Sequence, residues 1–314
     1  VNHQVKLGII SIAIVIPLAI SAVWYSNQPE PVVQYVEATK VVALASFYPL
    51  YEFTKEVGGE KVDVSLLVPL GMEPHDWEPT INDIQRIRQA DLIIINGVGF
   101  ESWIENIEEI NPDVTIIDSS KRIKIIKWQT SDHDEEDGEH NHDESLGDPH
   151  IWLNPLLAKI QVQNIADGLI QFNPENEKTY VNNANAFIKK LDDLDSKIRD
   201  GLTNCKRDFI VYHNAFSYFA DEYELTQHTI VKTNDPHAEP TSRHFEDIIN
   251  LAQELDLKII FTEEAEDSRI SQVIADEFNA KVLTLSPLEI TNDGSSYIEN
   301  MEKNLINLQK ALCN

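Results

Sequence analysis

The feature that most constrains the fold is an alternation of short, apolar, β-rich runs with longer amphipathic stretches, found in both halves of the chain. The first half contains four runs that we expect to form strands, at residues 41–46, 62–68, 91–97 and 114–120. The second half contains four more, at residues 208–213, 225–231, 258–263 and 280–286. Because strands separated by helices form βαβ units, successive strands are expected to run parallel. The sequence predicts two Rossmann-like α/β lobes with mainly parallel sheets.

The segment between the two halves, residues 173–204, predicts one long helix. Its apolar residues recur every three or four positions, and no Gly or Pro occurs between Glu175 and Asp200. This spacing is typical of a helix with one buried face, and such a helix spans about 40 Å at 1.5 Å per residue. We therefore expect a rigid helix that joins a first lobe at 40–172 to a second lobe at 205–314.

The N-terminal segment, residues 1–25, indicates export. An apolar run at 7–24 contains no charged residue, and its length is close to the 18–20 residues or so that span a bilayer. Lys6 precedes the run and no basic residue follows it closely, which places the body of the chain outside the cytoplasm. The segment is either a retained membrane anchor or a cleaved signal peptide, and residues 26–39 form a polar linker.

Composition narrows the classes of partner and of site. The net charge of −28 argues against a nucleic-acid partner, because phosphates would be repelled, and 42% hydrophobic residues exclude a wholly disordered chain. Two cysteines are present, Cys205 and Cys313. In an exported chain they either form a disulfide or remain free thiols. No CxxC pattern occurs, which excludes a cysteine zinc site.

Three histidines occupy positions where α/β folds place ligands, beyond the ends of strands. They are His75, His150 and His213, and Pro74 and Pro149 directly precede the first two. A proline restricts the local backbone and so lowers the entropy cost of placing the imidazole. Three neutral imidazoles that converge on one point suit Zn²⁺. Each histidine alone could equally be a structural hydrogen-bonding residue.

A low-complexity segment at 131–145 contains His133, His140 and His142 among many acidic residues. It has almost no apolar residues and cannot form a core. We expect a loop that collects metal ions weakly, and the alternative is a solvated acidic insert with incidental histidines.

Six segments of the chain carry a family resemblance. In chain order they read SFYPLYEFTKEVGGEKVDVSLLVPLGMEPHDWEPT, ADLIIINGVGFESWIENI, DPHIWLNP, FIVYHNAFSYFADEYEL, EPTSRHFEDII and IIFTEEAEDSRISQVIADEF. In content and order they resemble the zinc/manganese-binding solute-binding proteins of ABC transporters, the metal-binding cluster A-I family, over residues 41–312. The resemblance implies two α/β lobes bridged by a rigid helix, with a metal ion in the cleft between them.

The same resemblance implies roles for individual residues. It implies that His75, His150 and His213 are metal ligands. Zinc-type members of the family often carry a histidine- and acid-rich insert between the first two ligands, and the segment at 131–145 occupies that place.

The sequence departs from the family pattern at the fourth ligand. Many relatives have an Asp before a Pro-Leu pair near the C-terminus, whereas the motif TLSPLE places Ser286 there. A serine hydroxyl is a poor ligand for Zn²⁺ or Mn²⁺. We therefore expect a water molecule at the fourth position, or Glu263 from the motif IIFTEE. Three imidazoles with few oxygen ligands favour zinc over manganese.

We expect an extracytoplasmic protein, monomeric and without enzymatic activity, that captures Zn²⁺ and delivers it to an ABC permease. A binding protein for Mn²⁺ or Fe²⁺ is the alternative within the same transporter type. Two alternatives come from other classes. One is a surface adhesin, and the other is a secreted zinc hydrolase in which Glu263 would serve as general base.

Overall fold

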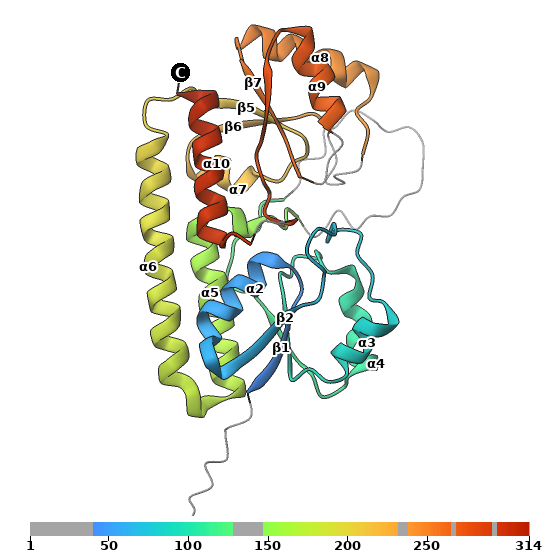
Figure 1. The fold of residues 1–314 in the computed structure, drawn as a ribbon, viewed down its shortest axis with the longest axis vertical. Helices are drawn as coiled ribbons and strands as arrows, with labels where there is room; N and C mark the ends of the chain where they lie inside the picture. The colour runs from blue at the N-terminus through green and yellow to red at the C-terminus, as the bar shows by residue number, and fades with distance from the viewer. Residues whose placement is uncertain (1–39, 128–146, 232–237, 265–267, 291–293, 314) are drawn as a thin grey trace, which may run out of the picture. The chain divides into compact units, whose positions relative to one another are not determined.

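The computed structural model describes residues 40–127, 147–231, 238–264, 268–290 and 294–313. The segments predicted at 1–25 and 26–39 and the histidine-bearing segment at 131–145 lie outside the described residues. From Lys40 onward the chain forms a single unit (Figure 1). Within the described part of the chain, no helix is both long enough and apolar enough to cross a membrane.

The first half contains a four-stranded sheet with the order β2-β1-β3-β4, and every pair in it is parallel. All residues of the inner strand β3 are buried, as expected of a strand covered on both faces. The four strands confirm the four predicted in this half: β1 Val41–Ala45, β2 Val62–Leu66, β3 Leu92–Ile95 and β4 Thr115–Asp118.

Short helices connect the strands of the first half. They are α2 Tyr48–Gly58, α3 Ile81–Ile87 and α4 Ile107–Ile110, with 3₁₀ turns η1 Gly59–Lys61 and η2 Ser102–Asn106. A third 3₁₀ turn, η3 Ile151–Leu153, follows the last strand of this half and precedes the first long helix. Thr80 caps α3: its hydroxyl accepts the backbone N–H of Asp83, and the carboxylate of Asp83 accepts the backbone N–H of Thr80. Helix α2 ends at Gly58, and Gly59 follows with a φ of 52°, which favours glycine.

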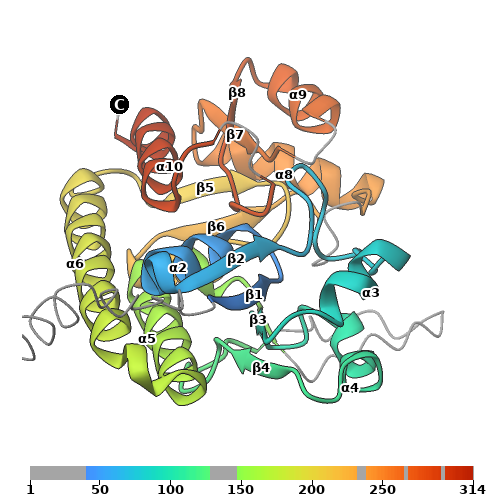
Figure 2. The same ribbon diagram turned by 60° about the horizontal axis from the view of Figure 1, so that its bottom comes forward.

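Two long helices connect the halves, where the sequence predicted one. They are α5 Pro155–Phe172 and α6 Glu177–Gly201, which lie side by side in Figures 1 and 2 and are separated by the 3₁₀ turn η4 Pro174–Asn176. The predicted helix at 173–204 corresponds to α6. Its predicted apolar positions are all buried: Tyr180, Ala184, Phe187, Leu191, Leu194 and Ile198.

The second half contains two parallel strand pairs, β5-β6 and β7-β8, and β5 lies next to β7. All four strands fall within the predicted runs: β5 Asp208–Val211, β6 Thr226–Thr229, β7 Ile259–Thr262 and β8 Lys281–Thr284. The helices are α7 Ser217–Glu222, α8 Ser242–Glu254, α9 Ser268–Glu277 and α10 Tyr297–Leu312. The structure confirms the predicted α/β class with parallel sheets and a long helix.

The main hydrophobic core runs through both halves. It extends from Ala43 on β1 through Leu191 on α6 to Phe209 on β5 and Leu308 on α10. A second core lies within the later half alone, around Ile260. Because one core includes residues from both halves and from the long helices, the halves are packed together rather than merely tethered.

Cys205 and Cys313 form a disulfide bond. The sequence left open whether these residues pair or stay free. The bond connects the segment after α6 to the end of α10, so the last helix is attached covalently to the long helix that joins the halves.

Candidate metal centre

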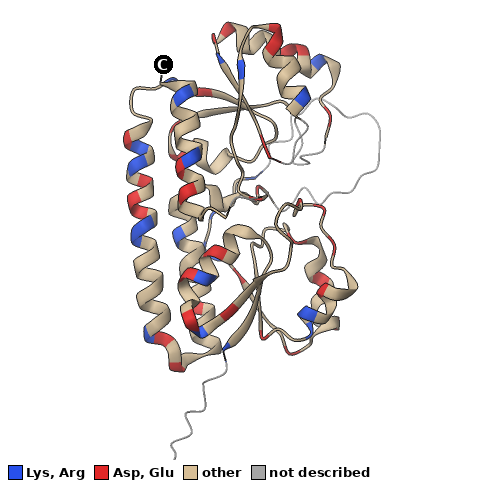
Figure 3. Cartoon of the chain, in the orientation of Figure 1, with Lys and Arg blue, Asp and Glu red and all other residues tan. Residues whose placement is uncertain are grey.

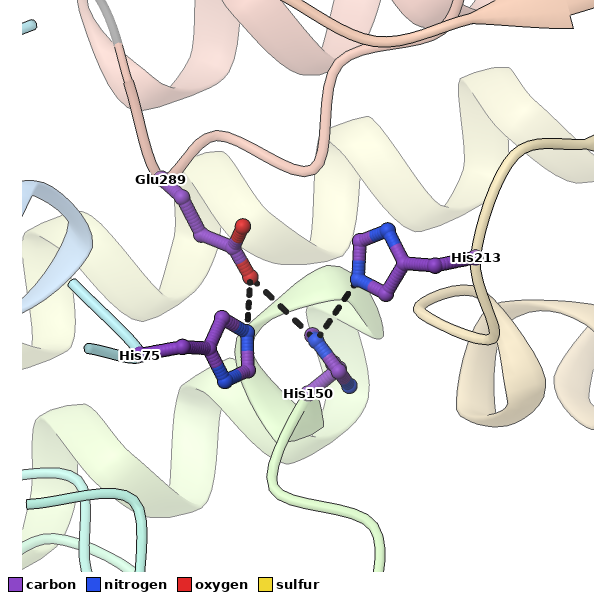
Figure 4. Close-up of side chains that lie close together, drawn as sticks. All are labelled: His75, His150, His213 and Glu289. Carbon is purple, nitrogen blue, oxygen red and sulfur yellow. Dashed lines mark hydrogen bonds and ion pairs between the residues drawn. The ribbon is translucent and has the colours of Figure 1, made fainter. Parts of the chain in front are cut away.

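Four side chains from distant parts of the chain converge on one point (Figure 4). They are His75, His150, His213 and Glu289, and each offers a ligand atom that lies within 4.8 Å of the other three. Oε1 of Glu289 lies 3.3 Å from His75 Nε2 and 3.2 Å from His150 Nε2. His150 Nε2 and His213 Nε2 are 3.3 Å apart. The three histidines that the sequence selected are therefore brought together by the fold.

Loops at the ends of secondary-structure elements position the four groups. His75 follows β2, His150 immediately precedes η3, His213 follows β5 by two residues, and Glu289 lies between β8 and α10. Parallel strands present their carboxyl ends at one edge of the sheet, so residues that follow different strands meet there.

The cluster is buried except at His75. The side chains of His150 and His213 have no exposed surface and that of Glu289 is 2% exposed, whereas that of His75 is 15% exposed. Solvent therefore reaches the cluster on the side of His75. The other three groups lie in a medium where a charge is costly unless it is paired.

Asp148 holds the ring of His150. Asp148 Oδ1 accepts a hydrogen bond from His150 Nδ1 at 2.7 Å and a second from its backbone N–H at 3.0 Å. This contact places the ring proton on Nδ1 and leaves Nε2 facing the cluster, as is usual for a histidine that binds a metal. Burial opposes protonation of His150, but the charges of Asp148 and Glu289 outweigh it and raise its pKa to about 10.

Glu263 holds the ring of His213 in the same way. Glu263 Oε2 accepts from His213 Nδ1 at 2.5 Å, and Oε1 accepts from the backbone N–H at 3.2 Å. Burial opposes protonation of His213 too, yet the charge of Glu263 raises its pKa above the usual value. The sequence suggested Glu263 as a fourth ligand. The structure instead places it on the outer side of the ring, away from the point where Nε2 faces the cluster.

Glu289 is the carboxylate that lies beside the three histidines, and the sequence reasoning did not single it out. Burial opposes its ionisation, but His75 and His150 outweigh this and hold the pKa of Glu289 well below its usual range. The signal was present in the sequence, because Glu289 directly follows the Pro-Leu pair that marks the fourth ligand in relatives. Glu289 lies three residues after Ser286, the residue that we compared with the Asp of the relatives.

Ser286 has a structural role. Its Oγ accepts the backbone N–H of Leu288 at 3.1 Å. Its backbone N–H donates to Asn304 at 2.8 Å, and its carbonyl oxygen accepts from the same side chain at 2.7 Å. The group that the structure places beside the three histidines is the carboxylate of Glu289.

Glu73 supports the segment that carries His75. Its Oε1 accepts the backbone N–H of His75 at 3.1 Å, and the ring of His75 packs against Phe100 with centroids 4.7 Å apart. Burial and the nearby charge of Glu289 raise the pKa of Glu73 to about 9.

Among the described residues, His228 and His244 lie outside the cluster. His133, His140 and His142 lie outside the described residues. His228 pairs with Asp208 at 2.9 Å, and His244 bonds the carbonyl oxygen of Thr229 at 3.0 Å.

The donor set fits a divalent zinc ion. Three imidazole nitrogens and one carboxylate oxygen supply the four ligands that Zn²⁺ takes in tetrahedral sites. Two of the imidazoles are already oriented by carboxylates on their outer nitrogens. Acidic residues lie among Lys and Arg on elements of both halves (Figure 3), and the net charge of −28 attracts cations.

Comparison with known proteins assigns a family. Residues 43–311 match the family described as "ZnuA: Zinc-uptake complex component A periplasmic". The high-affinity zinc uptake system protein ZnuA of Bacillus subtilis is 36% identical over 281 residues, which cover 87% of this chain and 88% of that protein. The zinc-binding protein AdcA of Streptococcus pyogenes is 32% identical over 94% of this chain. This chain spans 61% of AdcA.

Solved structures agree with this assignment. The laminin-binding protein Lmb of Streptococcus agalactiae, described as bifunctional with adhesin and metal-transporting activity, matches with a TM-score of 0.77 and 30% identity over 87% of this chain and 99% of that chain. The Zn(II)-bound ZnuA-like domain of Streptococcus pneumoniae AdcA matches with a TM-score of 0.73 and 29% identity, over 87% and 99% of the two chains. The sequence, the fold and these similarities together show that the chain belongs to the ZnuA family of zinc-uptake complex components.

Proposed function

We propose that this chain binds Zn²⁺ outside the cytoplasm and delivers it to the permease of an ABC transporter. The observation that carries the proposal is the buried cluster of His75, His150, His213 and Glu289. The names of the relatives, a zinc uptake protein and a zinc-binding protein, support the same function.

The donor set favours Zn²⁺ over Mn²⁺ or Fe²⁺. Imidazole ligands suit zinc, whereas manganese prefers sites that are rich in oxygen. The cluster offers three nitrogen donors and one carboxylate, and Glu263 is engaged with His213 on the side away from it. We propose that the four clustered groups bind the ion as a transported substrate.

Uptake of the ion exchanges protons for metal. His150 and His213 carry raised pKa values while no cation offsets the carboxylates, and protonated imidazole cannot coordinate a metal. Binding therefore releases protons from these rings, while Asp148 and Glu263 keep Nδ1–H in place. The carboxylate of Glu289 neutralises one of the two positive charges of the ion.

The two lobes, 40–172 and 205–314, are proposed to enclose the ion with little relative movement. The main core runs through both halves and through α6, the helix predicted at 173–204. Entry and exit then depend on the side of the cluster where His75 is exposed. All four groups belong to one chain, so we propose that a monomer is sufficient.

We propose that the protein acts outside the cytoplasm, with the segment at 1–25 as its anchor or signal peptide. The family description as periplasmic supports this location. His133, His140 and His142 are proposed to raise the local concentration of zinc. Deletion of 131–145 should slow zinc capture when zinc is scarce, and unchanged capture would contradict that role.

A hydrolase is disfavoured by the geometry. Catalytic zinc sites keep one position open for water, whereas four protein groups surround this point. Glu263, the residue suggested as general base, is bonded to His213. We expect no ester or phosphoester turnover by the zinc-loaded chain.

An adhesive role is a second candidate, favoured by the similarity to Lmb, which is described as bifunctional. Binding of the chain to immobilised laminin, measured with and without zinc, tests it. An absence of laminin binding in both conditions would remove this candidate.

Metal content measured by mass spectrometry tests the main proposal. The chain, purified without a metal-binding tag, is offered an equimolar mixture of zinc, manganese and iron. We expect about one zinc ion per chain, and none in a variant with Ala at His75, His150 and His213. His228→Ala is the matched control and should bind as the wild type does. Zinc retained by the triple variant, or manganese in the wild type, would contradict the proposal.

A further inference from the structure

The segment that carries Glu289 bonds to one residue, Trp152, on both sides of Glu289. The indole Nε1–H of Trp152 donates to the carbonyl oxygen of Pro287 at 2.7 Å. The hydroxyl of Tyr297, at the start of α10, donates to the carbonyl oxygen of Trp152 at 2.6 Å. Trp152 and Tyr297 are both fully buried. Because Trp152 lies two residues after His150, it connects the segment of one proposed ligand to that of another.

Neighbouring rings restrict the indole of Trp152. Its ring centroid lies 4.6 Å from that of Phe47 in an edge-on arrangement and 5.4 Å from that of Phe100. Phe100 also packs against His75, with centroids 4.7 Å apart. A fully buried ring held on several sides occupies one rotamer, so its N–H points steadily at Pro287.

The Glu289 segment needs such support. Leu288 has a φ of 62°, a left-handed conformation that bulky residues rarely adopt unless the surrounding structure enforces it. Asn304 on α10 bonds both the N–H and the carbonyl oxygen of Ser286, but these bonds lie on one side of the segment. The bond from Trp152 instead connects Pro287 to the segment that carries His150.

We propose that Trp152 is a positioning residue that sets the place of Glu289 relative to His150. The inference rests on the proposed role of Glu289 as a zinc ligand. Without the indole N–H, the buried carbonyl oxygen of Pro287 has lost its donor, and such a group is costly to leave unbonded. The segment then shifts, and the carboxylate no longer completes the four-group arrangement.

Zinc affinity and the visible spectrum of bound Co²⁺ test this role. Trp152→Phe removes the donor and keeps an aromatic ring, and Tyr297→Phe removes only a hydroxyl. Loss of contacts that orient ligands typically weakens metal binding by about 10- to 100-fold. We expect each variant to weaken zinc binding about tenfold or more, measured by competition with a chromophoric chelator, and to alter the Co²⁺ d–d bands. Trp103→Phe is the control, because Trp103 is a buried indole that packs against Trp77, and it should change neither readout.

Repeating Trp152→Phe in a Glu289→Gln background separates positioning from general damage. If Trp152 acts through Glu289, Trp152→Phe should weaken zinc binding by less than about twofold in the Glu289→Gln background, because the contribution of the Glu289 carboxylate is already lost there. An equal loss in both backgrounds would overturn the inference, as would unchanged affinity and spectra in both Trp152→Phe and Tyr297→Phe. If Trp152→Phe does not fold, Tyr297→Phe decides by the same criteria. A wild-type chain that binds no zinc would instead overturn the proposed function, and this inference with it.

Discussion

Zinc affinity should continue to rise with pH well above neutrality. An ordinary imidazole has a pKa near 6.5, so a site of ordinary histidines gains little affinity above pH 7 or so. Here the charges of Asp148 and Glu289 overcome the effect of burial and raise the pKa of His150 to about 10. In the absence of metal this ring is protonated at pH 7, and zinc must displace the proton to bind.

The magnitude follows from the size of the shift. One pKa unit corresponds to 1.36 kcal/mol, so removing the proton from His150 at pH 7 costs about 4 kcal/mol of the binding free energy. This cost falls as the pH approaches 10. The apparent dissociation constant should therefore decrease about tenfold per pH unit for each proton released. The pKa of His213 is raised as well, so its proton adds to the effect in the same direction.

Two measurements check the reasoning. Zinc affinity is measured by chelator competition at intervals between pH 6.5 and 8.5. Proton release is measured by calorimetry at one pH in two buffers with different ionisation enthalpies. We expect at least one proton per zinc ion at pH 7.5. Asp148→Asn is the informative variant, because loss of the carboxylate charge should reduce both the pH dependence and the protons released.

A flat affinity above pH 7, together with no proton release, would refute the argument. That result would mean that His150 is neutral in the metal-free protein despite its contacts with Asp148 and Glu289. The raised pKa of His150 also fixes how the stability of the metal-free protein depends on pH. Protonation of this ring stabilises the fold fully below about pH 6.5, and the stabilisation is lost as the pH rises toward 10. The metal-free protein should accordingly melt at a lower temperature at pH 9 than at pH 7.

Three further predictions concern the fourth ligand, the disulfide and the long helix. Glu289→Gln should weaken zinc binding more than Glu263→Gln does, because Glu289 faces the cluster whereas Glu263 orients the ring of His213. Chelator competition on both variants measures this, and the reverse ranking would restore Glu263 as the fourth ligand. Replacing Cys205 and Cys313 by Ser should lower the free energy of unfolding by about 2–5 kcal/mol in denaturant titrations while leaving the zinc content unchanged, and unaltered stability would show that the bond adds nothing to the packing of α10. Leu191→Ala should cost about 2–5 kcal/mol because this side chain of α6 is fully buried, and a loss below about 0.5 kcal/mol would mean that α6 does not belong to the core.

Much of the fold could be predicted because its elements are locally encoded. The strand β3 is an uninterrupted run of β-branched and apolar residues, and the buried positions of α6 recur with the period of a helix. Helix α5 was not predicted, because its buried side includes the polar Gln161 and Asn164 as well as apolar residues. Gln161 bonds Asn96 and Ser119, and Asn164 bonds backbone carbonyls near β4. These contacts exist only in the folded chain, and the polar residues interrupt the apolar positions Ala158, Val162, Ile165 and Leu169 on the buried side of the helix.

The sequence by itself determined the α/β class and the three histidines, because strand patterns and the motifs around each histidine are local properties. Only the tertiary structure decided which carboxylate faces them. Glu263 and Glu289 both lie beyond strands of the second half, but Glu263 bonds the outer nitrogen of His213 and Glu289 approaches the inner nitrogens of His75 and His150. The disulfide was decided in the same way, by the packing of α10 beside α6 across 108 positions. Sequence spacing carries no information about which side of a ring a distant group reaches, because that depends on how the packed elements direct the side chains.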